Sequence, residues 1–162
     1  MNSYVDAYIE IPFASEVKYE YDSKLKKMRC DRILNTSMQY PGNYGYIPNT
    51  LAKDGDALDI LVVCEYPLYP GTVIESKIIG ILIMEDEKGL DEKIIAVPSE
   101  KVDKNSKDIN HIHDLKKSTI KKISHFFSHY KDNDEDKWSK VTGYHDKTYA
   151  LGICNKYSIP NL

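Results

Sequence analysis

The sequence has few cysteines, few tryptophans and phenylalanines, and no long hydrophobic run. Its three cysteines, Cys30, Cys64 and Cys154, are odd in number and widely spaced, so they lack the spacing of a zinc site, a redox pair or a disulfide framework. We interpret them as reduced thiols of an intracellular protein. The N-terminal residues include no basic segment followed by an apolar run, which argues against secretion and against a membrane partner. We therefore expect a cytoplasmic protein.

The sequence also lacks an excess of positive charge. Twenty-five acidic and twenty-two basic residues give a net charge of -3. Proteins that follow a nucleic-acid backbone normally carry a basic surface, so the composition disfavours a nucleic-acid partner, although a local basic pocket stays possible. Repeats, low-complexity stretches and linker-like segments are lacking too. We expect a single domain over residues 1–162, long enough to bury one core.

Short apolar segments fill the first two thirds of the chain. Their composition and bounding turns predict strands at residues 5–11, 17–21, 28–34, 60–63, 73–84 and 93–97. Many short strands before any helix favour a barrel or a sandwich. Helical spacing from Leu115 to Tyr130 predicts a helix with Asp114 as its N-cap, whereas the mixed pattern of residues 147–162 carries no chemical signal.

Four further features allow more than one interpretation. Residues 39–49 are rich in Tyr, Gly, Asn and Pro, which predicts an irregular loop folded over a pocket or a strand. Residues 85–93 fit an exposed charged hairpin that needs no function, and Lys18 and Glu20 on one strand face fit a surface ion pair. His125 and His129 lie one helical turn apart, but the glutamate of a zinc protease motif is missing, which favours a packed or interface pair.

The most informative stretch is Asp54-Gly55-Asp56-Ala57-Leu58-Asp59, followed by an apolar strand. Three carboxylates in six residues raise one another's pKa values unless a positive charge lies between them. Oxygen ligands suit a hard divalent cation such as Mg²⁺, and the glycine permits a tight turn. A solvated turn explains the same residues, since Asp and Gly favour turns. The stretch alone does not decide between these alternatives.

Taken together, these motifs resemble a known family. Asp-Gly-Asp-x-x-Asp opens a strand, Tyr-Pro-x-Asn-Tyr-Gly-Tyr precedes it, and Lys-Tyr-Glu and Asp-Arg come earlier still. In order and spacing this arrangement resembles the type I soluble inorganic pyrophosphatases of the bacterial type, from about Glu10 to about Trp138. One departure is Ala57, where the family usually has Pro or Glu; it removes no ligand.

The resemblance implies a fold, an activity and a set of site residues. The fold is mainly β, an OB-like closed barrel of five strands with one long and one shorter C-terminal helix. The activity is Mg²⁺-dependent hydrolysis of inorganic pyrophosphate to two orthophosphates by a metal-activated water, with about three to four Mg²⁺ ions per site. The implied metal ligands are Asp54, Asp59, Asp91, Asp86 and Glu20, and Glu10 would act through water. The implied catalytic residues are Asp56, Tyr44 and Arg32, and the implied substrate ligands are Lys18, Arg32, Tyr40, Tyr44, Lys93, Tyr130 and Lys131.

Pyrophosphate and phosphate are thus the expected partners, and the helix region with His125, His129 and Asp132 matches the family's subunit contact. A homo-hexamer is favoured over a dimer. Three rival functions are considered: an EF-hand-like calcium module, disfavoured because Asp59 stands where that loop has glycine; an OB-type nucleic-acid-binding barrel; and a pyrophosphatase fold that has lost its activity.

Overall fold

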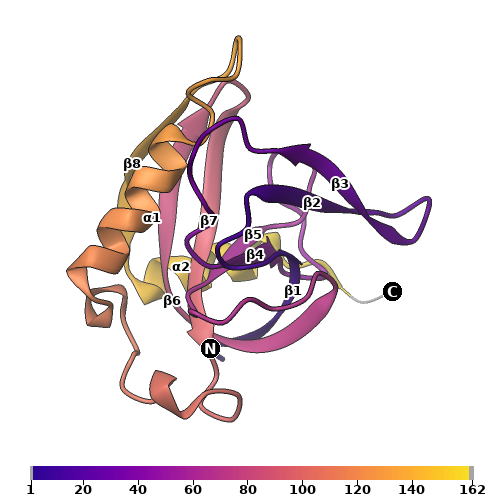
Figure 1. The fold of residues 1–162 in the computed structure, drawn as a ribbon. Helices are drawn as coiled ribbons and strands as arrows, with labels where there is room; N and C mark the ends of the chain where they lie inside the picture. The colour runs from indigo at the N-terminus through magenta and orange to yellow at the C-terminus, as the bar shows by residue number, and fades with distance from the viewer. Residues whose placement is uncertain (1, 161–162) are drawn as a thin grey trace.

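The computed structural model describes residues 2–160 (Figure 1). Its strands are β1 (Tyr4–Ile11), β2 (Val17–Asp22), β3 (Lys27–Ile33), β4 (Asn43–Tyr46), β5 (Asp59–Val62), β6 (Thr72–Asp86), β7 (Gly89–Pro98) and β8 (Ser139–His145). Its helices are α1 (Lys117–His129) and α2 (Lys147–Tyr157), with short 3-10 helices η1 (Lys104–Ser106) and η2 (Ile112–Asp114). Across residues 2–160, no helix is both long and apolar enough to cross a membrane.

Five strands close into a ring. The sheet order is β1-β4-β5-β7-β6, and β1 pairs a second time with β6, which joins the two ends. The pairings are antiparallel except that between β5 and β7. The prediction of a mainly β, five-stranded closed barrel with two helices is confirmed. The hairpin of β2 and β3 forms a separate two-stranded sheet beside the ring (Figure 1).

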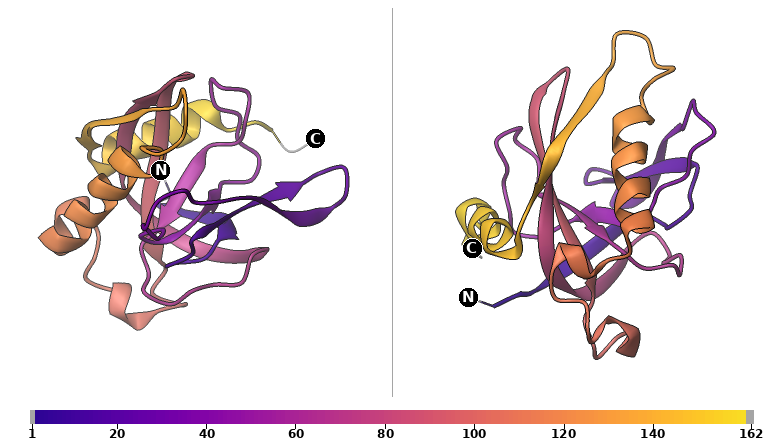
Figure 2. Two further views of the ribbon diagram at one scale, coloured as in Figure 1. Left: turned by 45° about the horizontal axis from the view of Figure 1, so that its top comes forward. Right: turned by 90° about the vertical axis from the view of Figure 1, so that its left-hand side faces the viewer.

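The longest strand, β6, connects the parts of the sheet. Its first residues pair with β1 from Tyr4 to Ile9, and its later residues pair with β7 on one side and β8 on the other. In Figure 2, α1 and α2 lie on opposite sides of the long strands β6 and β8. The strands therefore separate the two helices.

Each face of the strands buries its own hydrophobic core. Successive side chains of a strand point to opposite faces, so Ile60 and Val62 pack in one core with Ala150 of α2. Leu61 lies in the other core, with Phe127 of α1. The two helices thus cover apolar side chains on both faces of the strands and stabilise the ring.

Two local expectations differ from the structure, and two further elements had no sequence pattern that predicted them. Residues 43–46 of the supposed irregular loop form β4, because Asn43 and Gly45 take the buried positions where apolar residues would signal a strand. Strand β8 has no apolar alternation, and its burial alternates between partial and exposed. Residues 147–157 form α2, although their pattern is only weakly amphipathic.

The second difference is the start of α1. Asp114 does not cap this helix, since its carboxylate accepts hydrogen bonds from the backbone N–H groups of Asn110 and His111 and so closes the preceding turn η2. The helix begins at Lys117, with Lys116 as its N-cap. Asp114 lies three residues before α1, and its side chain satisfies backbone N–H groups of the preceding turn, not those at the start of the helix.

Candidate active site

All the side chains that the resemblance implies line one cavity of about 570 Å³. They come from β1, from the β2–β3 hairpin, from β4, from the acidic loop (residues 51–58), from β5, from the β6–β7 turn and β7, and from the C-terminal end of α1. The lining residues of the predicted set are Glu10, Lys18, Glu20, Arg32, Tyr40, Tyr44, Asp54, Asp56, Asp59, Asp86, Asp91, Lys93, Tyr130 and Lys131. Segments more than 100 residues apart in the sequence therefore meet at one site.

Lys93 holds the acidic end of the cavity together. Its ammonium lies 3.0 Å from Asp59 Oδ2 and 3.0 Å from Asp91 Oδ2, and its side chain is almost completely buried. Burial alone would lower the pKa of Lys93, but the Asp59 carboxylate and the neighbouring Tyr44 and Asp91 raise it well above the usual value. Lys93 is therefore a permanent cation between two carboxylates.

Tyr44 completes this group. Lys93 Nζ donates a hydrogen bond to the Tyr44 hydroxyl oxygen over 2.6 Å. Burial, and then the nearby Asp59, raise the pKa of Tyr44 well above its ordinary value, so the hydroxyl keeps its proton. Tyr44 can thus donate a hydrogen bond without adding charge.

The acidic loop forms the turn predicted from Asp-Gly-Asp. Gly55 has φ +87, and the backbone N–H of Asp56 donates to Asp54 Oδ1 over 3.0 Å. Behind the turn lies a small cavity of about 20 Å³, lined by Asp54 of the loop, Asp59 at the start of β5 and Asp91 of β7. This volume is about that of one water molecule or ion. The three carboxylates implied as ligands of the first metal thus share one small space.

The donor set fits a hard divalent cation. Carboxylate oxygens are the ligands that Mg²⁺ prefers, and burial raises the pKa of Asp91, with Asp59 adding a like charge. Within residues 2–160, no three His, Cys, Asp or Glu side chains are already arranged as a complete metal site. Lys93 provides the positive charge between Asp59 and Asp91 here, so binding of a cation requires these side chains to adjust.

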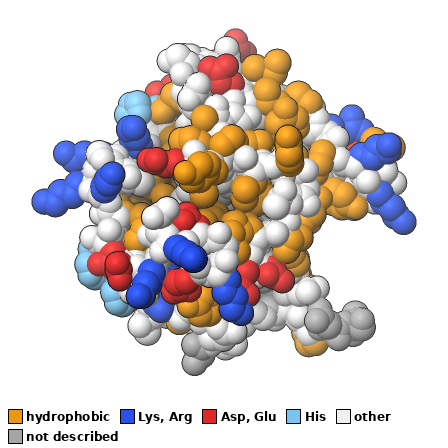
Figure 3. Space-filling model, turned by 60° about the horizontal axis from the view of Figure 1, so that its bottom comes forward, with side chains coloured by type: hydrophobic (Ala, Val, Ile, Leu, Met, Phe, Trp, Pro, Cys, Tyr) orange, Lys and Arg blue, Asp and Glu red, His pale blue; other side chains and the backbone are white. Residues whose placement is uncertain are grey.

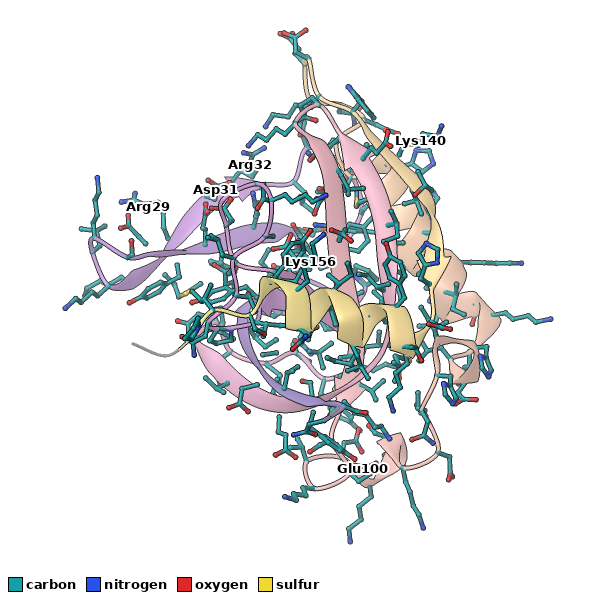
Figure 4. The ribbon with its side chains drawn as sticks, turned by 180° about the vertical axis from the view of Figure 1, so that it is seen from behind. Arg29, Asp31, Arg32, Glu100, Lys140 and Lys156 are labelled. Atoms are coloured by element: carbon teal, nitrogen blue, oxygen red, sulfur yellow. The ribbon has the colours of Figure 1, made fainter. Side chains whose placement is uncertain are left out.

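The β2–β3 hairpin forms a cationic wall. Lys18 Nζ lies 3.5 Å from Asp31 Oδ2, and Arg32 Nε donates to the same oxygen over 3.0 Å. Figure 4 shows Asp31 and Arg32 together on the hairpin. Lys18 therefore pairs with Asp31 across the hairpin and not with Glu20, so the interpretation of Lys18 and Glu20 as an ion pair is wrong.

A second cationic group faces it from the end of α1. Lys131 Nζ lies 3.1 Å from Asp86 Oδ2 and 3.3 Å from Glu87 Oε1 in the β6–β7 turn. Burial opposes the shift, but the backbone N–H of Lys88 and the Lys131 ammonium lower the pKa of Asp86, which stays ionised. The charged hairpin thus faces the cavity and contributes to its walls.

Glu10 links β1 to the hairpin. Its Oε2 accepts a hydrogen bond from the backbone N–H of Tyr21 over 2.8 Å. Burial raises the pKa of Glu10 to about 7, and the nearby Asp59 and Glu20 add to the shift against this hydrogen bond. Glu10 therefore changes charge near neutral pH while it holds the hairpin.

Tyr40 has a different environment from the other implied substrate ligands. Its side chain is 2% exposed, and its ring lies 4.6 Å from that of Phe126 between centroids. Tyr40 therefore forms part of the cavity's apolar base.

Sequence reasoning missed several residues of this region. Glu87, Lys88, Asp134 and Lys137 also line the cavity, and Asp31 fixes Lys18 and Arg32 from outside it. Asp31 stood next to Arg32 in the quoted Asp-Arg motif, and Glu87 lay in the charged hairpin. The only sequence signal for Asp31 and Glu87 was therefore their position next to residues of the motifs. The pairing of Asp31 with Lys18 depends on strand register and could not be predicted.

His125 and His129 lie outside the cavity-lining residues. Their ring centroids are 4.9 Å apart, and His129 Nδ1 lies 2.7 Å from Asp132 Oδ2. The His129 side chain is about half exposed. This arrangement gives the pair a carboxylate partner on the surface of α1, and residues 2–160 contain no metal-type cluster that includes them.

The closed ring and its cavity, lined by both carboxylates and cations, define a site suited to a phosphate compound bound together with metal ions. The family model described as inorganic pyrophosphatase matches residues 7–158. An inorganic pyrophosphatase of Rickettsia typhi is 51% identical over 150 residues, covering 92% of this chain and 84% of that protein. One of Sulfolobus acidocaldarius is 51% identical over 146 residues, covering 90% and 84%.

Solved structures agree with these sequence matches. The inorganic pyrophosphatase of Helicobacter pylori superimposes with a TM-score of 0.93 at 41% identity, covering 96% of this chain and 91% of that chain. The chain belongs to the inorganic pyrophosphatase family. It is accordingly an enzyme of the inorganic diphosphatase class, and the resemblance stated from its motifs is confirmed.

Proposed function

We propose that this protein hydrolyses inorganic pyrophosphate to two orthophosphates with Mg²⁺ as its cofactor. The observation that carries the proposal is the single cavity in which all the implied side chains meet, carboxylates and cations lining it together. Pyrophosphate is a small, highly charged anion, and its hydrolysis depends mainly on positioning and charge neutralisation. Both requirements match this distribution of charge.

We assign the first metal position to Asp54, Asp59 and Asp91, which share the small cavity. Asp86 and Glu20, on other walls, would bind further Mg²⁺ that arrives with the substrate. When bound, divalent cations supply positive charge that lowers the pKa of water and neutralises phosphate oxygens. Lys93 contacts both Asp59 and Asp91 and so keeps the two carboxylates close to each other.

Asp56 is the proposed base. It lies in the same turn as Asp54 and lines the cavity. The attacking water gives its proton towards the Asp56 carboxylate while its oxygen forms a bond to phosphorus. The bond from that phosphorus to the bridging oxygen breaks, and the second phosphate leaves with the bonding electrons. Glu10 acts indirectly, through water and through its hold on the hairpin.

The cationic walls bind the two phosphoryl groups. Arg32 can grip a phosphate with two parallel hydrogen bonds, and Lys18, Lys93 and Lys131 act as point charges. Tyr44 and Tyr130 are partly buried, and this desolvation raises the pKa of both hydroxyls, so they stay protonated and donate to phosphate oxygens. Tyr40 supports Tyr44 from the apolar side, since their ring centroids are 5.6 Å apart.

The deciding experiment is phosphate release from pyrophosphate by the purified protein. We expect two phosphates per pyrophosphate with Mg²⁺, and inhibition when Ca²⁺ is added. An Asp56→Asn variant is the matched control for contaminating activity. A folded wild-type protein that binds Mg²⁺ without releasing phosphate would establish the inactive alternative, and salt-sensitive binding of an oligonucleotide would favour the nucleic-acid alternative.

We further propose that the chain acts in the cytoplasm as a homo-oligomer, a hexamer rather than a dimer. One face of the molecule carries apolar side chains over a broad area (Figure 3). Large apolar side chains such as Tyr66, Tyr69 and Val73 are exposed, and the paired His125 and His129 lie on α1. Exposed apolar surface of this kind supports association between subunits.

A further inference from the structure

The C-terminal end of α2 contacts both elements that carry the proposed metal ligands. The Tyr157 backbone carbonyl accepts a hydrogen bond from the N–H of Leu51, the first residue of the acidic loop, over 2.8 Å. Its hydroxyl donates to Glu92 Oε1 of β7 over 2.9 Å. The Tyr157 side chain is only 7% exposed. One residue thus joins the acidic loop to β7.

The base of the acidic loop is held by several bonds. Thr50 Oγ1 donates to the Ile47 carbonyl over 2.6 Å and accepts from the Leu58 N–H over 2.9 Å, which ties the two ends of the loop together. Thr50 also forms a β-bridge with Ser158, the residue after Tyr157. The backbone of the loop is therefore anchored to the end of α2 as well as to the ring.

Glu92 is the corresponding anchor on β7. It follows Asp91 directly in the strand and lines the same small cavity as Asp54 and Asp59. Any shift of Glu92 along or across β7 moves the Asp91 backbone with it. Seen from behind, α2 crosses in front of the ring strands, with Lys156 labelled in the last turn that also contains Tyr157 (Figure 4).

We propose that Tyr157 is a positioning residue that sets the separation between the acidic loop and β7, and thereby the affinity of the Asp54, Asp59 and Asp91 site for its divalent cation. The inference rests on the proposed function, since it uses the ligands assigned there. Tyr157 contacts neither cation nor substrate. Its effect is geometric: small divalent cations demand narrow ranges of ligand distance, so a loop free to move away from β7 binds them less well.

The test is a calorimetric titration of metal-free protein with Mg²⁺. Tyr157→Phe removes the bond to Glu92 without changing charge or the backbone bond to Leu51. A hydrogen bond to a charged group is worth at least about tenfold in an equilibrium constant. Only the part of this contribution that differs between the metal-free and the metal-bound protein changes Kd, so we expect Kd for Mg²⁺ to rise about five- to tenfold. Tyr149→Phe, on the exposed face of the same helix, is the matched control and should leave Kd unchanged.

Kinetics provide a second readout. Turnover of Tyr157→Phe at saturating Mg²⁺ should approach the wild-type value, with the Mg²⁺ concentration for half-maximal rate raised by the same factor as Kd. A purely structural role would lower the melting temperature of the metal-free protein and leave Kd alone. A wild-type Kd in a folded Tyr157→Phe variant would overturn the inference.

Glu92→Ala separates geometry from charge. Loss of the Glu92 carboxylate weakens cation binding electrostatically as well, but in that background the Tyr157 hydroxyl has lost its partner. Tyr157→Phe should therefore have no further effect on Kd, and the two substitutions should be non-additive. Additive effects would reject the inference while leaving the proposed function intact. Failure of the wild-type protein to bind Mg²⁺ would instead reject the proposed function.

Discussion

At the scale of single residues, Lys93 explains how so many carboxylates coexist in one cavity. Its ammonium lies between Asp59 and Asp91 and also donates to Tyr44. Breaking such a buried group by removing one partner leaves an uncompensated charge, so each member depends on the others. Similar pairs hold Lys131 with Asp86, and Lys18 with Asp31. The cations of the cavity are thus held in place before substrate binds.

We expect Asp56 and Asp59 to have different roles, Asp56 in turnover and Asp59 in Mg²⁺ binding. Asp56→Asn removes the proposed base, so turnover should fall by about 10²-fold or more while Mg²⁺ affinity stays close to wild type. Asp59→Asn removes a proposed ligand and a partner of Lys93, so it should weaken Mg²⁺ binding by about tenfold. Calorimetry and steady-state kinetics on both variants measure the two effects. Equal Mg²⁺ affinity in the two variants would contradict the separate roles predicted for Asp56 and Asp59.

Glu10 predicts a pH dependence of stability. Its pKa is about 7 in the folded protein, above the ordinary value of 4.5 for a glutamate, because the carboxyl is buried, so the folded state favours the protonated carboxyl. Its stabilising contribution is therefore complete below about pH 4.5 and is lost as pH rises towards 7. Denaturant unfolding of metal-free protein should show this loss in the wild type. Glu10→Gln cannot ionise and should lack that component; parallel pH profiles for the two proteins would contradict the assignment.

At the scale of elements, β1 and β4 approach so closely that only glycine fits between them. A Cβ atom at Gly45 would overlap the backbone carbonyl of Tyr8, whereas a Cβ at Gly152 in α2 meets nothing within 4 Å. Backbone cannot move aside as a flexible side chain can. The ring at this point depends on the absence of a side chain.

Two glycine substitutions test this difference. Gly45→Ala should destabilise the protein by about 3 kcal/mol or more, because the β1–β4 ladder must open. Gly152→Ala should stabilise it by about 0.5 to 1 kcal/mol through helix propensity. Thermal or urea unfolding of the two variants gives both values. Equal stability of Gly45→Ala and the wild type would show that β1 and β4 can separate without cost.

Elements with apolar patterns could be predicted from the sequence, and elements without them could not. Strand β5 was predicted almost to its ends, because Ile60, Leu61 and Val62 are all buried. Strand β4 was hidden because its buried positions are Asn43 and Gly45, whose signal is that of a loop. In the cavity, motifs identified the residue types, but pairs such as Lys18 with Asp31 follow from strand register, which composition does not encode.

At the scale of the whole molecule, the proposed hexamer can be tested directly. Light scattering on the purified protein should give the mass of six chains rather than two. A His129→Ala variant, which also loses the contact to Asp132, should shift the population towards smaller species. Lys121→Ala, an exposed residue of the same helix, serves as control. A wild-type monomer would remove the role proposed for the histidines.

The closure of the ring by β1 and β6 also governs how the chain reaches its native state. Tyr4 pairs with Lys77, so closure joins segments separated by roughly 70 residues and must overcome a large loss of chain entropy. During synthesis β1 and β4 emerge before β6, so β1 can pair with β4 early, but its second pairing must wait until β6 has left the ribosome. Docking of β6 is therefore the expected slow step of folding, and amides of the β1–β6 ladder should be among the last to exchange with solvent deuterium.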